Sequence, residues 1–214
     1  ASSAPRDIKQ CRNAKYDLDG RKRLSKDDYA NLAELLKHDL VNFECMTCIG
    51  PDVMIILAHE EAIKLGVKLL KESAANAELK QMLSYDTTFN LGDFYLSVVV
   101  MRNTDFENDP IFPVIFYIHD RKLEDTHALF WFQAIRKLEL KTLLLNAPIV
   151  IDREKAIFNA LSSLSENVVF CQNHILRDVD FFVSKTKGEK FDKSAYKQFV
   201  KNLCETTDFE EKYN

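Results

Sequence analysis

The chain has 214 residues, of which 46% are apolar and 29% charged, and its formal net charge is −4. That length allows one large domain with an ample core, and the composition is ordinary for a globular protein. No run approaches the roughly 20 uninterrupted apolar residues of a membrane span, so no membrane partner is expected. The acidic balance excludes a surface that is basic throughout. DNA binding would therefore need locally clustered basic residues or regions outside this chain.

The cysteine count and the first residues bear on the compartment. Five cysteines are an odd number, which fits a reducing environment better than a disulfide framework. Residues 1–6 lack the apolar segment of a secretory signal peptide. An intracellular protein that is not secreted is therefore expected.

A polar, loosely ordered lead-in is expected over residues 1–24. Ser25 is then predicted to cap a helix, because small hydroxyl side chains accept hydrogen bonds from the first helical N–H groups. Asp27 and Asp28 would lie in the first turn of that helix, where a negative charge is favourable.

An α/β extension is expected over residues 25–81. The apolar run inside 51–58 predicts a buried strand, and apolar residues at helical spacing predict a helix over 60–72. More helix is expected over 74–80. This extension precedes the part of the chain that carries the distinctive motifs.

The core is predicted to be a mixed sheet over residues 82–175. The expected strands are 82–86, 94–101, 111–119, 143–151 and 167–171, with helices over 125–138 and 153–164. The first three strands follow one another directly and can pair as an antiparallel meander. Each later strand is reached through a helix and should lie parallel to its neighbour. This order is that of a ribonuclease H-like architecture, an α/β fold with a mixed five-stranded sheet flanked by helices.

The helix predicted over 125–138 carries apolar residues at helical spacing, which should face the core: Leu129, Phe132, Ile135 and Leu138. Trp131 is expected to pack rather than to stack on a base. Two charged helices are predicted over 175–185 and 194–204, so residues 176–214 read as the start of a helical insertion.

Two carboxylates stand out in this layout. Asp86 ends the strand predicted over 82–86, and Asp152 directly follows the strand predicted over 143–151. Acids at the ends of neighbouring strands can hold a divalent metal ion against a phosphate. The alternative is structural, since Asp152 could simply cap the helix that begins at Arg153.

Four segments, in order, resemble the motifs of Mutator-like (MULE) transposase domains. They are the first-acid motif at Asp86–Tyr95, the third strand at Pro113–His119, the second-acid motif at Ile151–Ile157 and the Cys-x-x-His signature at Cys171–Asp178. The resemblance covers roughly residues 82 to 185. It implies a ribonuclease H-like, DDE-type nuclear protein that cleaves and joins DNA with Mg²⁺ or Mn²⁺. Asp86 matches the first metal-binding acid of the family and Asp152 the second.

The third acid of the family is a glutamate on a helix beyond the insertion, and the chain is expected to end inside that insertion. Glu205, Glu210 and Glu211 stand in surroundings that resemble insertion helix. Asp178, on the helix after the fifth strand, is a weaker substitute. A second hypothesis therefore stays open, in which a domesticated domain keeps the fold but acts without catalysis as a scaffold that binds protein or DNA. Protein contacts or a homodimer would then involve the insertion.

Two further sets of residues are candidates. A zinc site would combine Cys45 and Cys48 with Cys171 and His174, although chance cysteine pairs in the core are the simpler explanation.

The basic candidates for DNA backbone contacts are Arg121 and Lys122, expected with His119 in an exposed loop, and Arg153 and Lys155 beside the second acid. The alternative for the loop is a solvated turn.

Overall fold

The computed structural model describes residues 27–37, 43–49, 52–75, 81–103, 106, 108, 110–138, 147–185 and 192–205. The chain divides into two compact units, 1–42 and 43–214. This boundary differs from the expected division at residue 81, because the strands after residue 43 join the same sheet as the core. No helix among these residues is both long and apolar enough to cross a membrane.

The first unit contributes the helix α2 (Asp28–Leu35). Its N-cap is Asp27, whose Oδ1 accepts hydrogen bonds from the N–H groups of Tyr29 (2.9 Å) and Ala30 (3.3 Å). The cap is thus two residues later than predicted, and Ser25 lies outside the described residues. A carboxylate at this position satisfies two otherwise unpaired donors and interacts favourably with the helix dipole.

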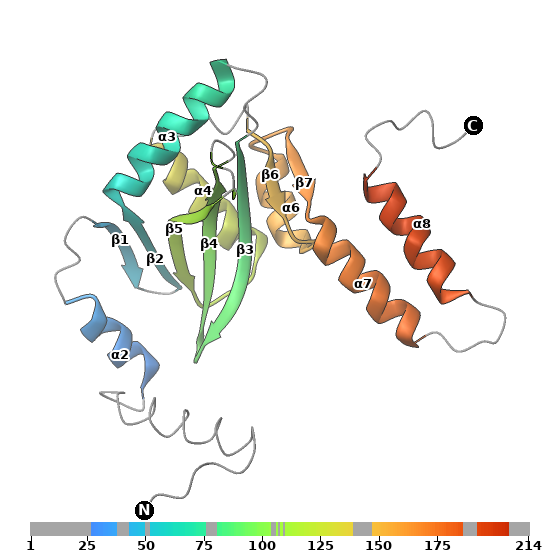
Figure 1. Ribbon diagram of the computed structural model, residues 1–214. Coiled ribbons are helices and arrows are strands. Elements are labelled where there is room, and N and C mark those ends of the chain that lie inside the picture. The colour runs from blue at the N-terminus through green and yellow to red at the C-terminus, as the bar shows by residue number, and fades with distance from the viewer. Residues whose placement is uncertain are drawn as a thin grey trace, which may run out of the picture. The chain divides into compact units, whose positions relative to one another are not determined.

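The second unit is built on a seven-stranded mixed sheet (Figure 1). Its strands are β1 (Phe43–Ile49), β2 (Val53–His59), β3 (Met82–Leu91), β4 (Phe94–Arg102), β5 (Ile111–His119), β6 (Ile149–Ile151) and β7 (Val168–Phe170). They lie side by side in the order β1-β2-β5-β4-β3-β6-β7. The α/β class is confirmed, and β1 was not predicted.

The pairing pattern of the five core strands follows the prediction. β3, β4 and β5 form an antiparallel meander, and β6 and β7 lie parallel to β3 and to each other. β3, the first of the five, therefore occupies the centre of the core. β2 pairs antiparallel with β5 and carries β1 on its other side, so part of the expected extension belongs to this sheet.

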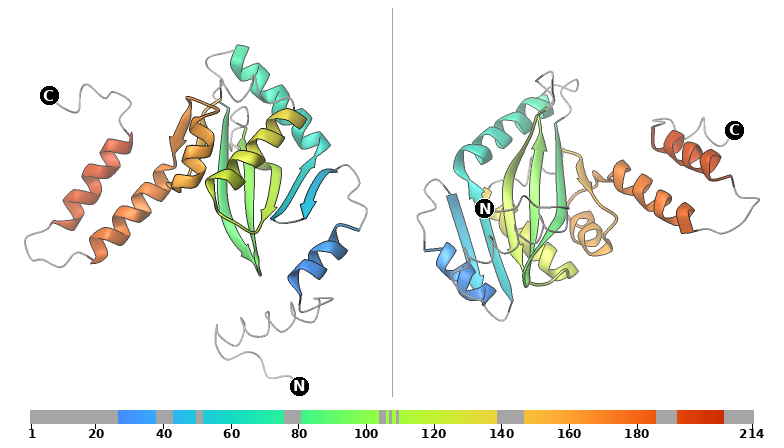
Figure 2. Two further views of the ribbon diagram at one scale, coloured as in Figure 1. Left: turned by 180° about the vertical axis from the view of Figure 1, so that it is seen from behind. Right: turned by 60° about the horizontal axis from the view of Figure 1, so that its bottom comes forward.

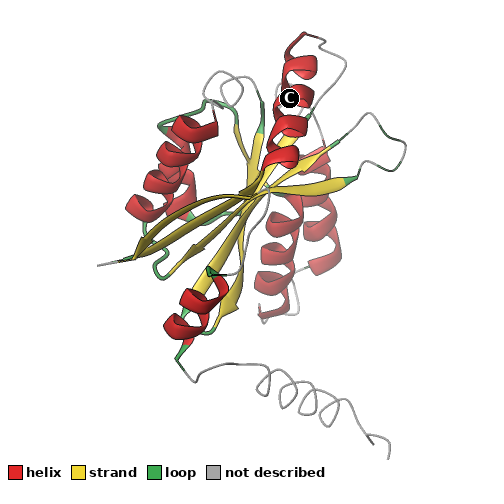
Figure 3. Ribbon diagram, turned by 90° about the vertical axis from the view of Figure 1, so that its left-hand side faces the viewer, coloured by secondary structure: helices red, strands yellow, loops and turns green. Residues whose placement is uncertain are grey.

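Helices lie on both sides of the sheet, as the side view of Figure 3 shows. They are α3 (Glu60–Ala75), α4 (Glu124–Leu138), α6 (Lys155–Ser162), α7 (Gln172–Lys185) and α8 (Lys193–Glu205). α4 crosses one face of the sheet, which Figure 2 shows from behind, and it packs along α6. α7 and α8 form a pair linked by an ion pair between Asp180 and Lys197.

The core face of α4 is only partly the one predicted, since Ile135 packs against the core but Leu129 and Phe132 do not. Phe130, Trp131 and Ala134 are buried, whereas Leu129 is 45% exposed and Phe132 58% exposed. The helix is rotated because its wide aromatic side chains fill the space over β3, β4 and β5. Trp131 packs in the core as predicted, and it has no exposed area.

Tyr85 stands at the centre of this core and has no exposed area. Its ring stacks on Phe130 at 5.3 Å and meets Trp131 edge-on at 5.1 Å. Burial of such side chains contributes roughly 1.5–3 kcal/mol each. The position of β3, and so of the residues beside Tyr85, is therefore fixed by packing against α4.

Candidate functional site

Asp86 and Asp152 come from two adjacent parallel strands. β3 pairs with β6, and Tyr85 lies opposite Ile151 in that register. Each acid directly follows one of these paired residues, so both carboxylates start from the same level of the sheet. Adjacent strands lie about 4.8 Å apart, a spacing at which one cation can contact two carboxylates.

Asp86 is not at the end of its strand, contrary to the prediction. β3 continues to Leu91, and Asp86 pairs with Val98 in the β3–β4 hairpin. The strand extends this far because the hairpin closes only at Gly92, whose φ of 68° suits a residue without Cβ. Asp152 directly follows the last residue of β6, as predicted.

A cavity of about 360 Å³ brings four expected site residues together: Asp86, Asp152, Cys171 and His174. The even-numbered strand residues around them, such as Ser84, line the sheet face opposite α4. The start of α7 is held beside Asp152 because the Cys171 N–H donates a 2.7 Å hydrogen bond to the Ile151 carbonyl.

The carboxylates of this cavity repel one another. Burial raises the pKa of Asp86 above its ordinary value, and the charge of Asp152 raises it further. His174 and Lys122 act in the opposite direction and lower the same pKa. A cation bound in the cavity would therefore favour the ionised form of Asp86.

Glu154 is a further carboxylate, two residues after Asp152, that was not predicted from the sequence and does not line the cavity. Its pKa is raised mainly by burial and also by the charges of Asp152 and Asp86, while Lys122 lowers it. Asp152 Oδ1 accepts a 2.8 Å hydrogen bond from the Glu154 N–H, and this turn leads into α6. The spacing Asp-x-Glu after a strand was the available signal. Asp86, Asp152 and Glu154 are called the acidic cluster below.

Among the four basic candidates, Lys122 is the one that reaches the acidic cluster. Its Nζ lies 4.0 Å from Glu154 Oε2 and 4.8 Å from the centre of the Tyr95 ring. Arg121 instead pairs with Asp52 at 2.9 Å.

The two basic residues beside Asp152 point to other environments. Arg153 pairs with Asp178 at 3.4 Å, and Lys155 is an exposed residue at the start of α6. Asp178 is thus held in an exposed ion pair and is not on the cavity wall. Glu205 ends α8, and Glu210 and Glu211 lie outside the described residues.

The residues of the predicted zinc site are not brought together. Cys45 and Cys48 are on β1 at one edge of the sheet, whereas Cys171 and His174 adjoin β7 at the other. Seven strands at the usual spacing separate these edges by roughly 29 Å. Within the described part of the chain, no three or more His, Cys, Asp or Glu side chains form a group that could hold a metal ion. Cys171 is a free thiol.

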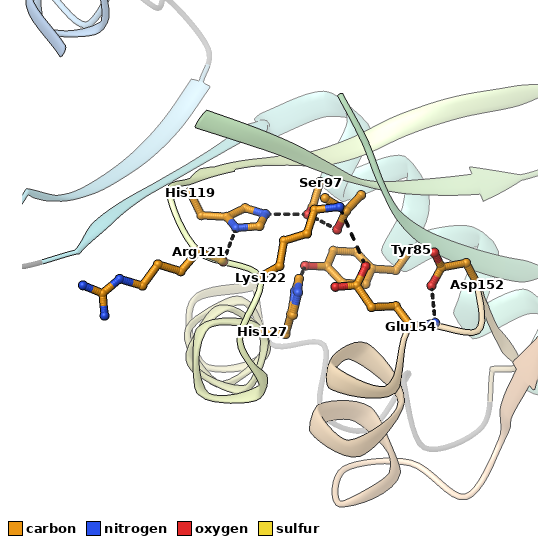
Figure 4. A network of polar contacts seen from close by, with 9 residues as sticks. Tyr85, Ser97, His119, Arg121, Lys122, His127, Asp152 and Glu154 are labelled. Atoms are coloured by element: carbon orange, nitrogen blue, oxygen red, sulfur yellow. Dashed lines mark hydrogen bonds and ion pairs between the residues drawn. The ribbon is translucent and has the colours of Figure 1, made fainter. Parts of the chain in front are cut away.

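A buried polar network lies on the other face of β3 (Figure 4). His119 was expected in an exposed loop, but it is the last residue of β5 and has no exposed area. Its Nε2 lies 2.7 Å from Ser97 Oγ, which in turn lies 2.7 Å from Thr87 Oγ1. Buried polar groups are retained when they are hydrogen bonded in this way.

A second histidine belongs to the same region. His127 of α4 is fully buried, and its Nδ1 lies 2.8 Å from the Tyr85 hydroxyl. Burial lowers the pKa of His119 to about 4 and that of His127 to about 3, so both are neutral near pH 7. Tyr85, Thr87, Ser97, His119 and His127 are called the buried polar network below.

With this geometry in place, comparisons with known proteins add no relative. No protein-family model matches the chain, and no match is found among curated proteins or solved structures.

Proposed function

We propose that residues 82–185 form a ribonuclease H-like, transposase-derived DDE domain whose Asp86 and Asp152 hold Mg²⁺ or Mn²⁺ for cleavage and strand transfer of DNA. The observation that carries the proposal is the placement of these two acids on the adjacent parallel strands β3 and β6. The strand order is consistent with it, because β3 is central, the meander follows, and β6 and β7 add in parallel.

The donor set fits these metal ions. Mg²⁺ prefers oxygen ligands and is commonly held by one or two carboxylates, with water and substrate phosphates completing the octahedron. When both are ionised, Asp86 and Asp152 carry a formal charge of −2, which one divalent cation neutralises. A bound metal would polarise the phosphodiester and activate the attacking water or 3′-hydroxyl. Asp86 and Asp152 would hold that ion, and Cys171 and His174 line the same cavity.

The partner in this proposal is DNA, and the compartment is the nucleus. The net charge of −4 suggests that regions outside the chain supply part of the affinity. Protein contacts through α7 and α8 stay a prediction.

The alternative is a domesticated, catalytically inactive domain that binds protein or DNA. It is favoured by the ion pairing of Arg121 and Arg153, which leaves Lys122 as the basic candidate closest to the acidic cluster. Incubation of the protein with supercoiled DNA and Mn²⁺ separates the two, since the alternative predicts no nicking that depends on Asp86.

Metal binding is tested by thermal melting during titration with Mn²⁺. The melting temperature should rise by several degrees at a metal concentration about 100-fold above Kd, because binding to the folded state alone stabilises by about 2.7 kcal/mol. The shift should vanish in Asp86→Asn. Asp178→Asn is the matched control, since it removes the same charge from an exposed ion pair outside the cavity. A wild-type protein that shows no shift at millimolar Mn²⁺ would refute the metal site.

A further inference from the structure

A chain of hydrogen bonds links the strand that carries Asp86 to the loop that carries Lys122. Thr87 Oγ1 and Ser97 Oγ are 2.7 Å apart, and Ser97 Oγ and His119 Nε2 are also 2.7 Å apart. The last link joins His119 Nδ1 to the carbonyl oxygen of Arg121 at 2.7 Å. These three contacts cross β3, β4 and β5 and end one residue before Lys122.

The direction of each bond follows from the last one. A carbonyl oxygen can only accept, so His119 Nδ1–H must donate to Arg121. The neutral imidazole then has its lone pair on Nε2 and accepts from the Ser97 hydroxyl. Ser97 Oγ is left to accept from Thr87. One arrangement of protons therefore satisfies the whole chain.

The Ser97–His119 pair has the spacing of a nucleophile and its base, but it cannot act as one on a substrate. Both residues have no exposed area. The pair must act through what it holds. That is the segment from Asp120 to Leu123, which joins β5 to α4 and carries the side chain of Lys122 over the Tyr95 ring.

The ammonium group of Lys122 lies between an aromatic ring and a carboxylate. Tyr95 pairs with His119 in the β4–β5 register, so the ring beneath Lys122 and the histidine that anchors its loop are cross-strand neighbours. Lys122 Nζ lies 4.0 Å from Glu154, a weak contact that leaves hydrogen-bonding capacity for a further anion.

We propose that Lys122 binds a phosphate oxygen of the DNA substrate beside Glu154 of the acidic cluster, and that His119 is the positioning residue that holds it there through the Arg121 carbonyl. This inference rests on the proposed function, because it assigns the phosphate to the same acidic cluster. It differs from that function in placing the specificity for phosphate in the loop after β5.

The first experiment measures binding of a fluorescein-labelled DNA duplex in Mn²⁺ by anisotropy at several salt concentrations. Lys122→Gln should weaken binding about tenfold and reduce the slope of log K against log salt by about 1. Arg121→Gln is the matched control, because it removes the same charge one residue away but keeps the carbonyl that His119 holds. It should change binding less than about threefold. Equal effects of the two variants, or a wild-type chain that binds no duplex, would overturn the role of Lys122.

The second experiment compares two amide variants of His119. His119→Asn places its amide where Nδ1 lies and keeps a donor for the Arg121 carbonyl, whereas His119→Gln reaches the position of Nε2 and contacts Ser97. We expect His119→Asn to bind DNA as the wild type does. His119→Gln should lose as much DNA affinity as Lys122→Gln, and the double variant with both substitutions should lose no more than either one. A merely structural histidine would give two variants of similar affinity and additive losses.

A measurement on the wild-type protein keeps the inference testable if both variants fail to fold. In ¹⁵N-histidine NMR spectra near pH 7, His119 should be the Nδ1–H tautomer, and an Nε2–H tautomer would overturn the chain of hydrogen bonds. The Mn²⁺ melting shift tells the two proposals apart. A shift without any special effect of Lys122 or His119 refutes this inference alone, whereas absence of the shift refutes the metal site.

Discussion

Tyr85 and Asp86 are neighbours on β3, yet their side chains enter opposite environments. Tyr85 faces α4, where the buried polar network is neutral and hydrogen bonded. Asp86 faces the cavity, where burial and the charge of Asp152 oppose its ionisation. On the α4 face most polar atoms have partners, although His127 Nε2 is buried without one. On the cavity face, burial and Asp152 raise the pKa of Asp86, and His174 and Lys122 offset only part of that increase. The contrast shows which polar residues maintain the fold and which are available to a ligand.

The largest effect on the free energy of unfolding should come from truncating Tyr85 on the buried face of β3. Tyr85→Ala removes a fully buried ring that packs against Phe130 and Trp131, and should cost about 3–5 kcal/mol in the free energy of unfolding. Tyr85→Phe should cost only about 1–2 kcal/mol, for the partner left at His127. Ser84→Ala on the cavity face should cost less than about 1 kcal/mol. Urea denaturation measures all three, and equal costs for Tyr85→Ala and Ser84→Ala would remove the contrast.

The pH dependence should be next in size. The folded pKa values of His119 and His127, about 4 and about 3, lie below the unfolded value near 6.5. Their contribution to stability is therefore complete above pH 6.5 and is lost as the pH falls toward 4, because the unfolded state takes up the protons first. The loss between pH 7 and pH 4 should be on the order of 2–3 kcal/mol for each histidine. Urea denaturation at each pH measures it.

His119→Asn is the control for this effect. Asparagine takes up no proton in this range, so the variant should retain more of its own neutral-pH stability at pH 4 than the wild type does. A fall as steep as that of the wild type would show that His119 does not contribute to the pH dependence.

The smallest effect should be a gain in stability when Asp86, on the cavity face, loses its charge. The pKa of Asp86 is raised in the fold, so its contribution is favourable in acid and is lost as the pH rises through that pKa. Asp86→Asn should therefore stabilise the metal-free protein at pH 7 by about 1 kcal/mol. The gain should disappear in acid, where the wild-type carboxyl group is also neutral. A loss at pH 7 would mean that Asp86 is already compensated by partners within the fold.

Much of this contrast could be predicted from the sequence, because it depends on local pattern. Alternation and β-branched residues located the core strands, and the helices between them gave the parallel placement of β6 and β7. The adjacency of Asp86 and Asp152 followed from that order.

The buried histidine pair and the orientation of α4 depend on contacts between residues that are distant in the sequence, which a local sequence pattern does not predict. His127 meets Tyr85 across 42 positions of the chain, so neither residue alone signals the pair. The rotation of α4 was set by the fit of Phe130 and Trp131 over the sheet, which outweighed the apolar spacing that includes Phe132. The length of β3 was the avoidable error, since Gly92 and Asp93 between two apolar runs are a hairpin signal.

Pro113 affects whether the exposed edge of this sheet can pair with a strand of another chain. Asn103 N–H donates to the Pro110 carbonyl at 2.9 Å, so the backbone of Pro110 faces β4 and, three residues on, that of Pro113 faces the opposite side. In the described residues the ladder with β2 reaches only as far as Ile115. Pro113 therefore stands where the edge of β5 is left open, and it has no N–H to offer. An extended segment of another molecule could not form a backbone hydrogen bond to Pro113. The missing donor therefore protects a long apolar strand from edge-to-edge aggregation.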